Sequence, residues 1–80
     1  MKTYFIEFYG HKSRASKNKC YGFNYFKIES NDLKSLRKDL EPKVTEFKSN
    51  LKSSNVNFVQ AYIYYPKDGN DILPLEVFEY

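Results

Sequence analysis

The sequence is poor in the residues that build covalent, metal and catalytic sites. It has one cysteine, one histidine, three glycines and no tryptophan among 80 residues. The lone Cys20 excludes an internal disulfide, and one cysteine with one histidine cannot provide the four ligands of a structural zinc site. Gly10, Gly22 and Gly69 are scattered, which excludes a glycine-rich phosphate loop. We therefore expect no cofactor and no metal, and stability that rests on the core alone.

Long apolar segments are also lacking. No apolar run approaches the roughly 20 residues that span a membrane, and Glu7 interrupts the apolar start of the chain before a signal-peptide core can form. There is no Asn-x-Ser/Thr acceptor for glycosylation. With 41% hydrophobic and 29% charged residues, the composition is that of a globular protein. We expect one domain over residues 1–80, in the cytoplasm and away from membranes.

Catalytic groups are scarce. His11 lies in a segment that we expect to be a mobile loop, where it lacks an orienting partner. Cys20, nine residues later, is expected to be a half-buried residue at the start of a strand rather than a nucleophile. Asp68 and Asp71 flank a Gly/Asn turn and are typical of turns in which these side chains bond their own backbone. The sequence predicts that the chain is not an enzyme.

Arginine is rare among the cations. The chain has thirteen Lys and Arg, of which only Arg14 and Arg37 are arginines, and a formal net charge of +3. Dedicated nucleic-acid binders more often use arginine for bidentate contacts. The charge is also polarised: residues 68–80 contain acids and no cation, whereas residues 11–19 contain cations and no acid. The molecule is therefore not uniformly basic.

What the sequence does have is aromatic residues, eight Tyr and seven Phe, almost all in two blocks. Alternation predicts strands at about 2–9 and 21–29, paired as an antiparallel hairpin with a long basic loop between them. Two further strands are predicted at 56–65 and 72–80, with a turn at 66–71 and Pro74 near the start of the last strand.

The middle of the chain has helical periodicity. Apolar residues recur every three or four positions over about 21 residues and form one stripe. Its members are Leu33, Leu36, Leu40, Val44, Phe47 and Leu51. Ser30 or Asn31 is expected to cap the helix. Pro42 predicts a kink or brief break at residues 39–42 with one continuous buried face, and two separate helices are the lesser alternative.

The element order predicts an α+β fold, ββαββ, with a four-stranded mixed sheet and one helix packed on one face. By analogy with the β-grasp arrangement, we expect the strand order 2-1-4-3, and a meander of neighbouring hairpins is the alternative. No motif indicates a particular family.

One helix covers only one face of a sheet, and these strands are apolar on both faces. The residues expected to face the helix are Tyr4, Ile6, Phe8, Phe26, Ile28, Val59, Ala61, Ile63, Leu75 and Val77. Those expected to face away are Phe5, Tyr9, Tyr21, Phe23, Tyr25, Phe58, Tyr62, Tyr64, Phe78 and Tyr80. So many outward rings form a patch larger than monomers usually expose.

Three interpretations of this patch are open. The rings can lie flat beneath the basic loop and the C-terminal residues, bind a protein or a second copy of the chain, or stack on unpaired bases. We expect a small non-enzymatic protein-binding module, typical of accessory or mobile-element proteins that inhibit host machinery. The alternative is a single-stranded nucleic-acid-binding protein with phosphate contacts from Lys and Arg. The predicted partner-binding residues are Tyr21, Phe23, Tyr25, Tyr62, Tyr64, Lys12, Arg14, Lys17 and Lys19.

Overall fold

A computed structural model describes residues 1–16, 18–65 and 73–80. Its elements are β1 (Lys2–His11), the 3-10 turn η1 (Arg14–Ser16), β2 (Gly22–Ser30), α1 (Leu33–Asp39), α2 (Glu41–Asn50), the 3-10 turn η2 (Lys52–Ser54), β3 (Phe58–Tyr64) and β4 (Glu76–Glu79). The α+β class and the ββαββ order are confirmed. Lys17 and the predicted turn at 66–71 lie outside the described residues.

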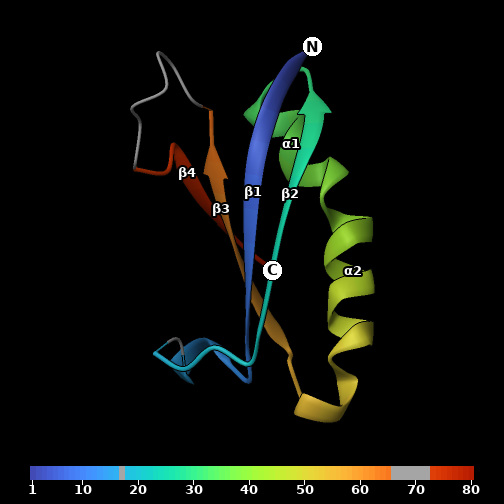
Figure 1. The fold of residues 1–80 in the computed structure, drawn as a ribbon, viewed down its shortest axis with the longest axis vertical. Coiled ribbons are helices and arrows are strands. Elements are labelled where there is room, and N and C mark those ends of the chain that lie inside the picture. The colour runs from blue at the N-terminus through green and yellow to red at the C-terminus, as the bar shows by residue number, and fades with distance from the viewer. Residues whose placement is uncertain (17, 66–72) are drawn as a thin grey trace.

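The sheet is antiparallel throughout, in the order β2-β1-β3-β4 (Figure 1). The expected mixed sheet of order 2-1-4-3 is wrong, because β3 and not β4 pairs with β1. A simple meander is also excluded, since β1 separates β2 from β3. The physical reason lies in the strands themselves. β3 is apolar on both faces and suits the centre, whereas β4 has four residues, two of them Glu, and suits an edge.

The helical segment bends where the sequence predicts it. Leu40 ends α1 and begins α2, and its N–H donates to the carbonyl of Leu36 at 3.0 Å. The N–H of Val44 in turn donates to the carbonyl of Leu40 at 2.9 Å, so the hydrogen bonding continues through the junction. Pro42 lies in the first turn of α2, where its missing donor costs little. The two segments form one bent helix with one buried stripe, as expected.

The helix begins later than predicted. The side chain of Asp32, and not of Ser30 or Asn31, accepts the N–H of Ser35 at 2.8 Å, which lowers the pKa of Asp32. Ser30 instead ends β2, where it is buried and donates its hydroxyl to Asp39 at 2.8 Å. This bond ties the end of the strand to the end of α1.

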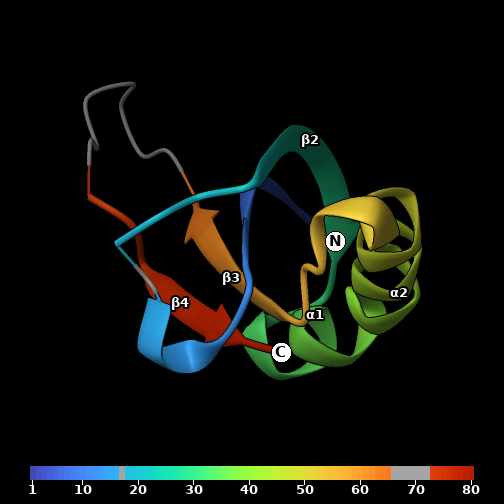
Figure 2. The ribbon, with the colours of Figure 1, turned by 90° about the horizontal axis from the view of Figure 1, so that it is seen from below.

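Both helical segments cover the same face of the sheet (Figure 2). Alternate residues of β1 and β3 fill the space beneath them. The buried residues that these two strands contribute on this side are Tyr4, Ile6, Phe8, Val59, Ala61 and Ile63. They meet Leu36, Leu40, Val44 and Phe47 from the helices. The predicted inward faces of these two strands are confirmed.

The face assigned to β4 is wrong. Phe78 pairs with Ala61 in the ladder and is buried on the helix side. Tyr80 lies on the same side, because its hydroxyl donates to the carbonyl of Arg37 in α1 at 2.8 Å. Val77 and Glu79 therefore point outward. A shift of one residue in register moves every side chain of a strand to the opposite face.

Candidate functional site

The face of the sheet turned away from the helices is lined by rings from three adjacent strands. Because β1 pairs with β2 on one side and β3 on the other, alternate residues of all three come together there. We call this surface the open aromatic face. It consists of Phe5, Glu7, Tyr9, Phe23, Tyr25, Tyr62 and Tyr64.

The rings of the open aromatic face contact one another. The Tyr9 ring centroid lies 5.2 Å from that of Phe23 and 5.1 Å from that of Tyr62. Phe5 and Tyr25 stack with centroids 6.4 Å apart and an interplanar angle of 21°. Phe23 is 56% exposed and Tyr25 is 54% exposed. Apolar surface therefore remains accessible on the edge strand β2.

A carboxylate lies among these rings. Glu7 pairs in register with Tyr25 on β2 and with Tyr62 on β3. Burial raises the pKa of Tyr64 to about 12, and a hydrogen bond to Glu7 and the Glu7 charge add to the rise. Burial also raises the pKa of Tyr9, again with a contribution from Glu7. The Glu7 carboxylate thus lies close to the hydroxyls of Tyr9 and Tyr64, among the rings of this face. Our sequence-based prediction of the site missed Glu7, although its alternation with Phe5 and Tyr9 indicated this position.

The other end of the same face is covered by the loop between β1 and β2. His11 pairs with Phe58, and both are buried. Nδ1 of His11 lies 2.8 Å from the carbonyl of Lys19 and must donate to it, since a carbonyl only accepts. The expectation of a solvated His11 in a mobile loop is wrong, because β1 continues to His11 and the loop folds back over it. Nε2 of His11 has no partner among the described residues.

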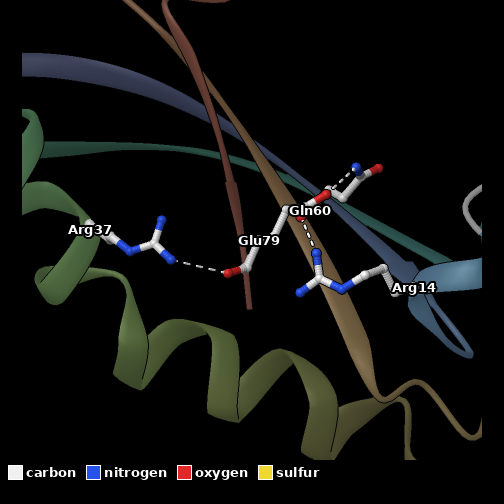
Figure 3. A network of polar contacts seen from close by, with 4 residues as sticks. All are labelled: Arg14, Arg37, Gln60 and Glu79. Carbon is white, nitrogen blue, oxygen red and sulfur yellow. Dashed lines mark hydrogen bonds and ion pairs between the residues drawn. The ribbon is translucent and has the colours of Figure 1, made fainter.

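Two arginine side chains bind β4, Arg14 from the β1–β2 loop and Arg37 from α1 on the helix side (Figure 3). Arg14 forms an ion pair with the Glu79 carboxylate. Gln60 donates to the other oxygen of that carboxylate at 3.3 Å, and Arg37 donates to the Glu79 main-chain carbonyl at 3.3 Å. The guanidinium carbon of Arg14 also lies 4.8 Å from the ring centroid of Phe58. One cation thus binds a carboxylate and an aromatic ring together.

The predicted site residues fall into two groups. Phe23, Tyr25, Tyr62 and Tyr64 come together on the open aromatic face, as expected. Tyr21, which directly precedes β2, is half-buried against the core, with the ammonium groups of Lys12 and Lys19 over its ring at 4.8 and 5.8 Å. Arg14 joins the network around Glu79, and Lys17 lies outside the described residues.

The remaining reactive group, Cys20, lies in the loop between β1 and β2. Cys20 is exposed, against expectation, and its Sγ donates to the carbonyl of Gly22 at 2.9 Å. Among residues 1–16, 18–65 and 73–80, no three His, Cys, Asp or Glu side chains are grouped to hold a metal ion. The described residues line a hollow of about 160 Å³ between β2 and α2, and a second of about 360 Å³ beside Tyr4, Tyr65 and Leu75.

Neither helix in the described part of the chain has the length and apolarity needed to cross a membrane. Comparison with protein families, with curated proteins and with solved structures finds no match for this chain.

Proposed function

We propose that the chain is a small protein-binding module and that the open aromatic face is its binding surface. The observation that carries the proposal is the exposure of Phe23 and Tyr25, each more than half accessible while in contact with half-buried rings. Tyr and Phe are enriched in the centres of protein interfaces, and fixing their two side-chain torsions costs little entropy. A partner that covers this face gains contact area at small entropic cost.

Charge favours a protein partner over single-stranded nucleic acid. The phosphate backbone is repelled by an acid, and Glu7 lies between Tyr25 and Tyr62, where bases would stack. Two cations of the loop also have partners within the chain: Arg14 binds Glu79, and Lys12 lies over the Tyr21 ring. Stacking of bases remains the alternative proposal, supported by the ring contacts alone.

Binding without catalysis is part of the same proposal. The only histidine is buried, and its Nδ1 is engaged by the Lys19 carbonyl. A general base must reach the proton that it removes, and His11 lies beneath the loop, beside Phe58. This position supports a structural role for His11.

Site-specific photo-crosslinking tests the proposal. A benzophenone amino acid is placed at Tyr25, and in a second protein at Lys38 on the exposed surface of α1. Irradiation in the native cells should give a discrete protein adduct from position 25 and none from position 38. The adduct should be lost with the additional change Phe23→Ser, because this removes the ring next to Tyr9 without touching the core.

The mass and chemistry of the adduct decide between the occupants. A protein adduct supports the proposal, and an adduct of two copies of the chain identifies the partner as itself. An adduct destroyed by nuclease, or none above the level at position 38, contradicts it. Circular dichroism of the Phe23→Ser variant ensures that a lost adduct reflects a lost contact and not unfolding.

A further inference from the structure

The open side of the sheet already binds one arginine. At the end beneath the β1–β2 loop, the guanidinium of Arg14 lies over the ring of Phe58 and pairs with Glu79. Guanidinium is planar and can stack on a ring while its N–H groups bind a carboxylate. This arrangement shows, within the chain, which ligand chemistry a Glu and an aromatic ring on this sheet accept.

Glu7 likewise combines a carboxylate with neighbouring aromatic rings, four residues along β1 from His11, the residue that pairs with Phe58. Tyr25 and Tyr62 flank it across the ladder, and Phe5 and Tyr9 flank it along β1. Ring faces and the carboxylate both present negative potential to whatever lies above them. No ion pair among the described residues involves Glu7. Lys27, the exposed cation of β2 beside Tyr25, forms none with it.

We propose that the partner presents an arginine side chain, on a basic segment, to Glu7 on the open aromatic face. This inference rests on the proposed function and names the chemistry of the partner at that surface. The guanidinium binds the Glu7 carboxylate and lies over a neighbouring tyrosine ring, as Arg14 binds Glu79 and lies over Phe58. Lysine fits less well, because an ammonium group is a point charge without a plane to stack.

The overall charge makes this site easy to test. The chain has a net charge of +3, so an arginine-rich peptide is repelled by the molecule as a whole. Binding of such a peptide therefore requires a local acidic site. The probe is a fluorescein-labelled peptide of alternating arginine and serine, with lysine/serine and glutamate/serine counterparts, measured by fluorescence anisotropy at low ionic strength.

The decisive variant is Glu7→Gln, which keeps the shape and hydrogen-bonding capacity of the side chain. Its matched control is Glu46→Gln, which removes the same charge from an exposed position on α2. We expect the arginine peptide to bind the wild-type protein and the Glu46→Gln variant alike, and the Glu7→Gln variant about tenfold more weakly. The lysine peptide should bind more weakly than the arginine peptide, and the glutamate peptide should not bind.

Equal affinity for the two variants, or no binding of the arginine peptide to the wild-type protein, overturns the inference. Tighter binding of oligo-uridine than of the arginine peptide overturns it in favour of nucleic acid. The crosslinking experiment separates the two proposals. If the Tyr25 adduct forms equally well with Glu7→Gln but is lost with Phe23→Ser, the protein-binding function stands and the arginine does not.

Discussion

The guanidinium of Arg14 lies over the ring of Phe58, with its carbon 4.8 Å from the ring centroid. Together with the ion pair to Glu79, this contact holds the β1–β2 loop against the sheet. The Arg14 side chain is 65% exposed, so solvent weakens the ion pair. The contact therefore positions the loop more than it stabilises the fold.

Replacing Arg14 by Ala should release the loop at small cost to the whole molecule. We expect the free energy of unfolding in urea to fall by about 1 kcal/mol or less. Trypsin should cleave after Lys19 several times faster, because the loop separates more often from Phe58. Arg14→Lys should give an intermediate rate, since it keeps the charge but loses the planar guanidinium group over the Phe58 ring. Unchanged cleavage in both variants would mean that other contacts hold the loop.

His11 makes the second attachment of this loop, through the Lys19 carbonyl. Replacing His11 by Ala should lower the free energy of unfolding by about 1–3 kcal/mol, since it opens space beside Phe58 and removes the donor. His11→Asn should lose less, because the Asn amide nitrogen can take the place of Nδ1. Chemical denaturation of both variants measures the difference. Equal losses would show that packing alone, and not the hydrogen bond, holds the loop.

The contacts of the β1–β2 loop with β4 could not be predicted from the sequence. Arg14 and Glu79 are separated by 65 positions, and no local pattern indicates that they meet. Composition alone therefore predicts only a mobile basic loop there. Glu7 differs, because its alternation with Phe5 and Tyr9 already placed it on the aromatic side of β1. Its role was missed because a single acid in an apolar strand gave no signal of its own.

Among the strands, too, some faces could be predicted from the sequence and one could not. The faces of β1 and β3 followed from long alternation anchored by Ile6 and Ile63, which pair in the sheet. The inward face of β4 could not be predicted in this way, because a strand of four residues with one buried ring fits either register equally well. The position of β4 at the edge could have been inferred from its two acids and the preceding Pro74, since central strands avoid both. The analogy with β-grasp order instead predicts a central position for β4.

Two glycines test how tightly the helix packs on the sheet. A Cβ at Gly10 would lie 2.9 Å from Cγ1 of Val56 and 3.2 Å from Cε2 of Phe47, both buried. A Cβ at Gly22 would meet the tip of Leu51, which is partly exposed and can turn away. We expect Gly10→Ala to lower the free energy of unfolding by about 1–3 kcal/mol and Gly22→Ala by less.

Denaturant unfolding of the two glycine variants gives the comparison directly. The double variant Gly10→Ala, Val56→Ala should lose less than the sum of its two single changes, because removing the Val56 methyl groups makes room for the new Cβ. Strict additivity would contradict a contact between these positions.

Glu7 should control the titration of Tyr64. Its hydrogen bond and charge add to the effect of burial in raising the Tyr64 pKa to about 12. Glu7→Gln should therefore shift the Tyr64 pKa downward, although burial keeps it above the usual 10.0. Tyrosine ring resonances followed by NMR against pH measure the shift, and Glu46→Gln is the control. An unchanged Tyr64 pKa in Glu7→Gln would mean that the Glu7 carboxylate does not interact with the Tyr64 hydroxyl.

Tyr80 should make stability depend on alkaline pH. Burial raises its pKa from 10.0 to about 12, a rise that the nearby Arg37 charge opposes. Because the pKa is higher in the folded state, the stabilising contribution is complete below pH 10 and is lost as the pH rises from 10 towards 12. The physical cause is that a buried phenolate is poorly solvated and cannot donate to the Arg37 carbonyl, as the neutral hydroxyl does at 2.8 Å.

The variant Tyr80→Phe separates this contribution from the rest. At neutral pH it should lower the free energy of unfolding by about 0.5–1.5 kcal/mol through loss of that hydrogen bond. Above pH 10 its stability should fall less steeply than that of the wild-type protein. Tyr25→Phe, at a ring that is 54% exposed, provides the control and should retain the wild-type slope. Urea unfolding at intervals from pH 8 to about 11.5 measures all three proteins. Parallel curves would mean that Tyr80 ionises as readily in the folded chain as in the unfolded one, and that its hydroxyl is not held against α1.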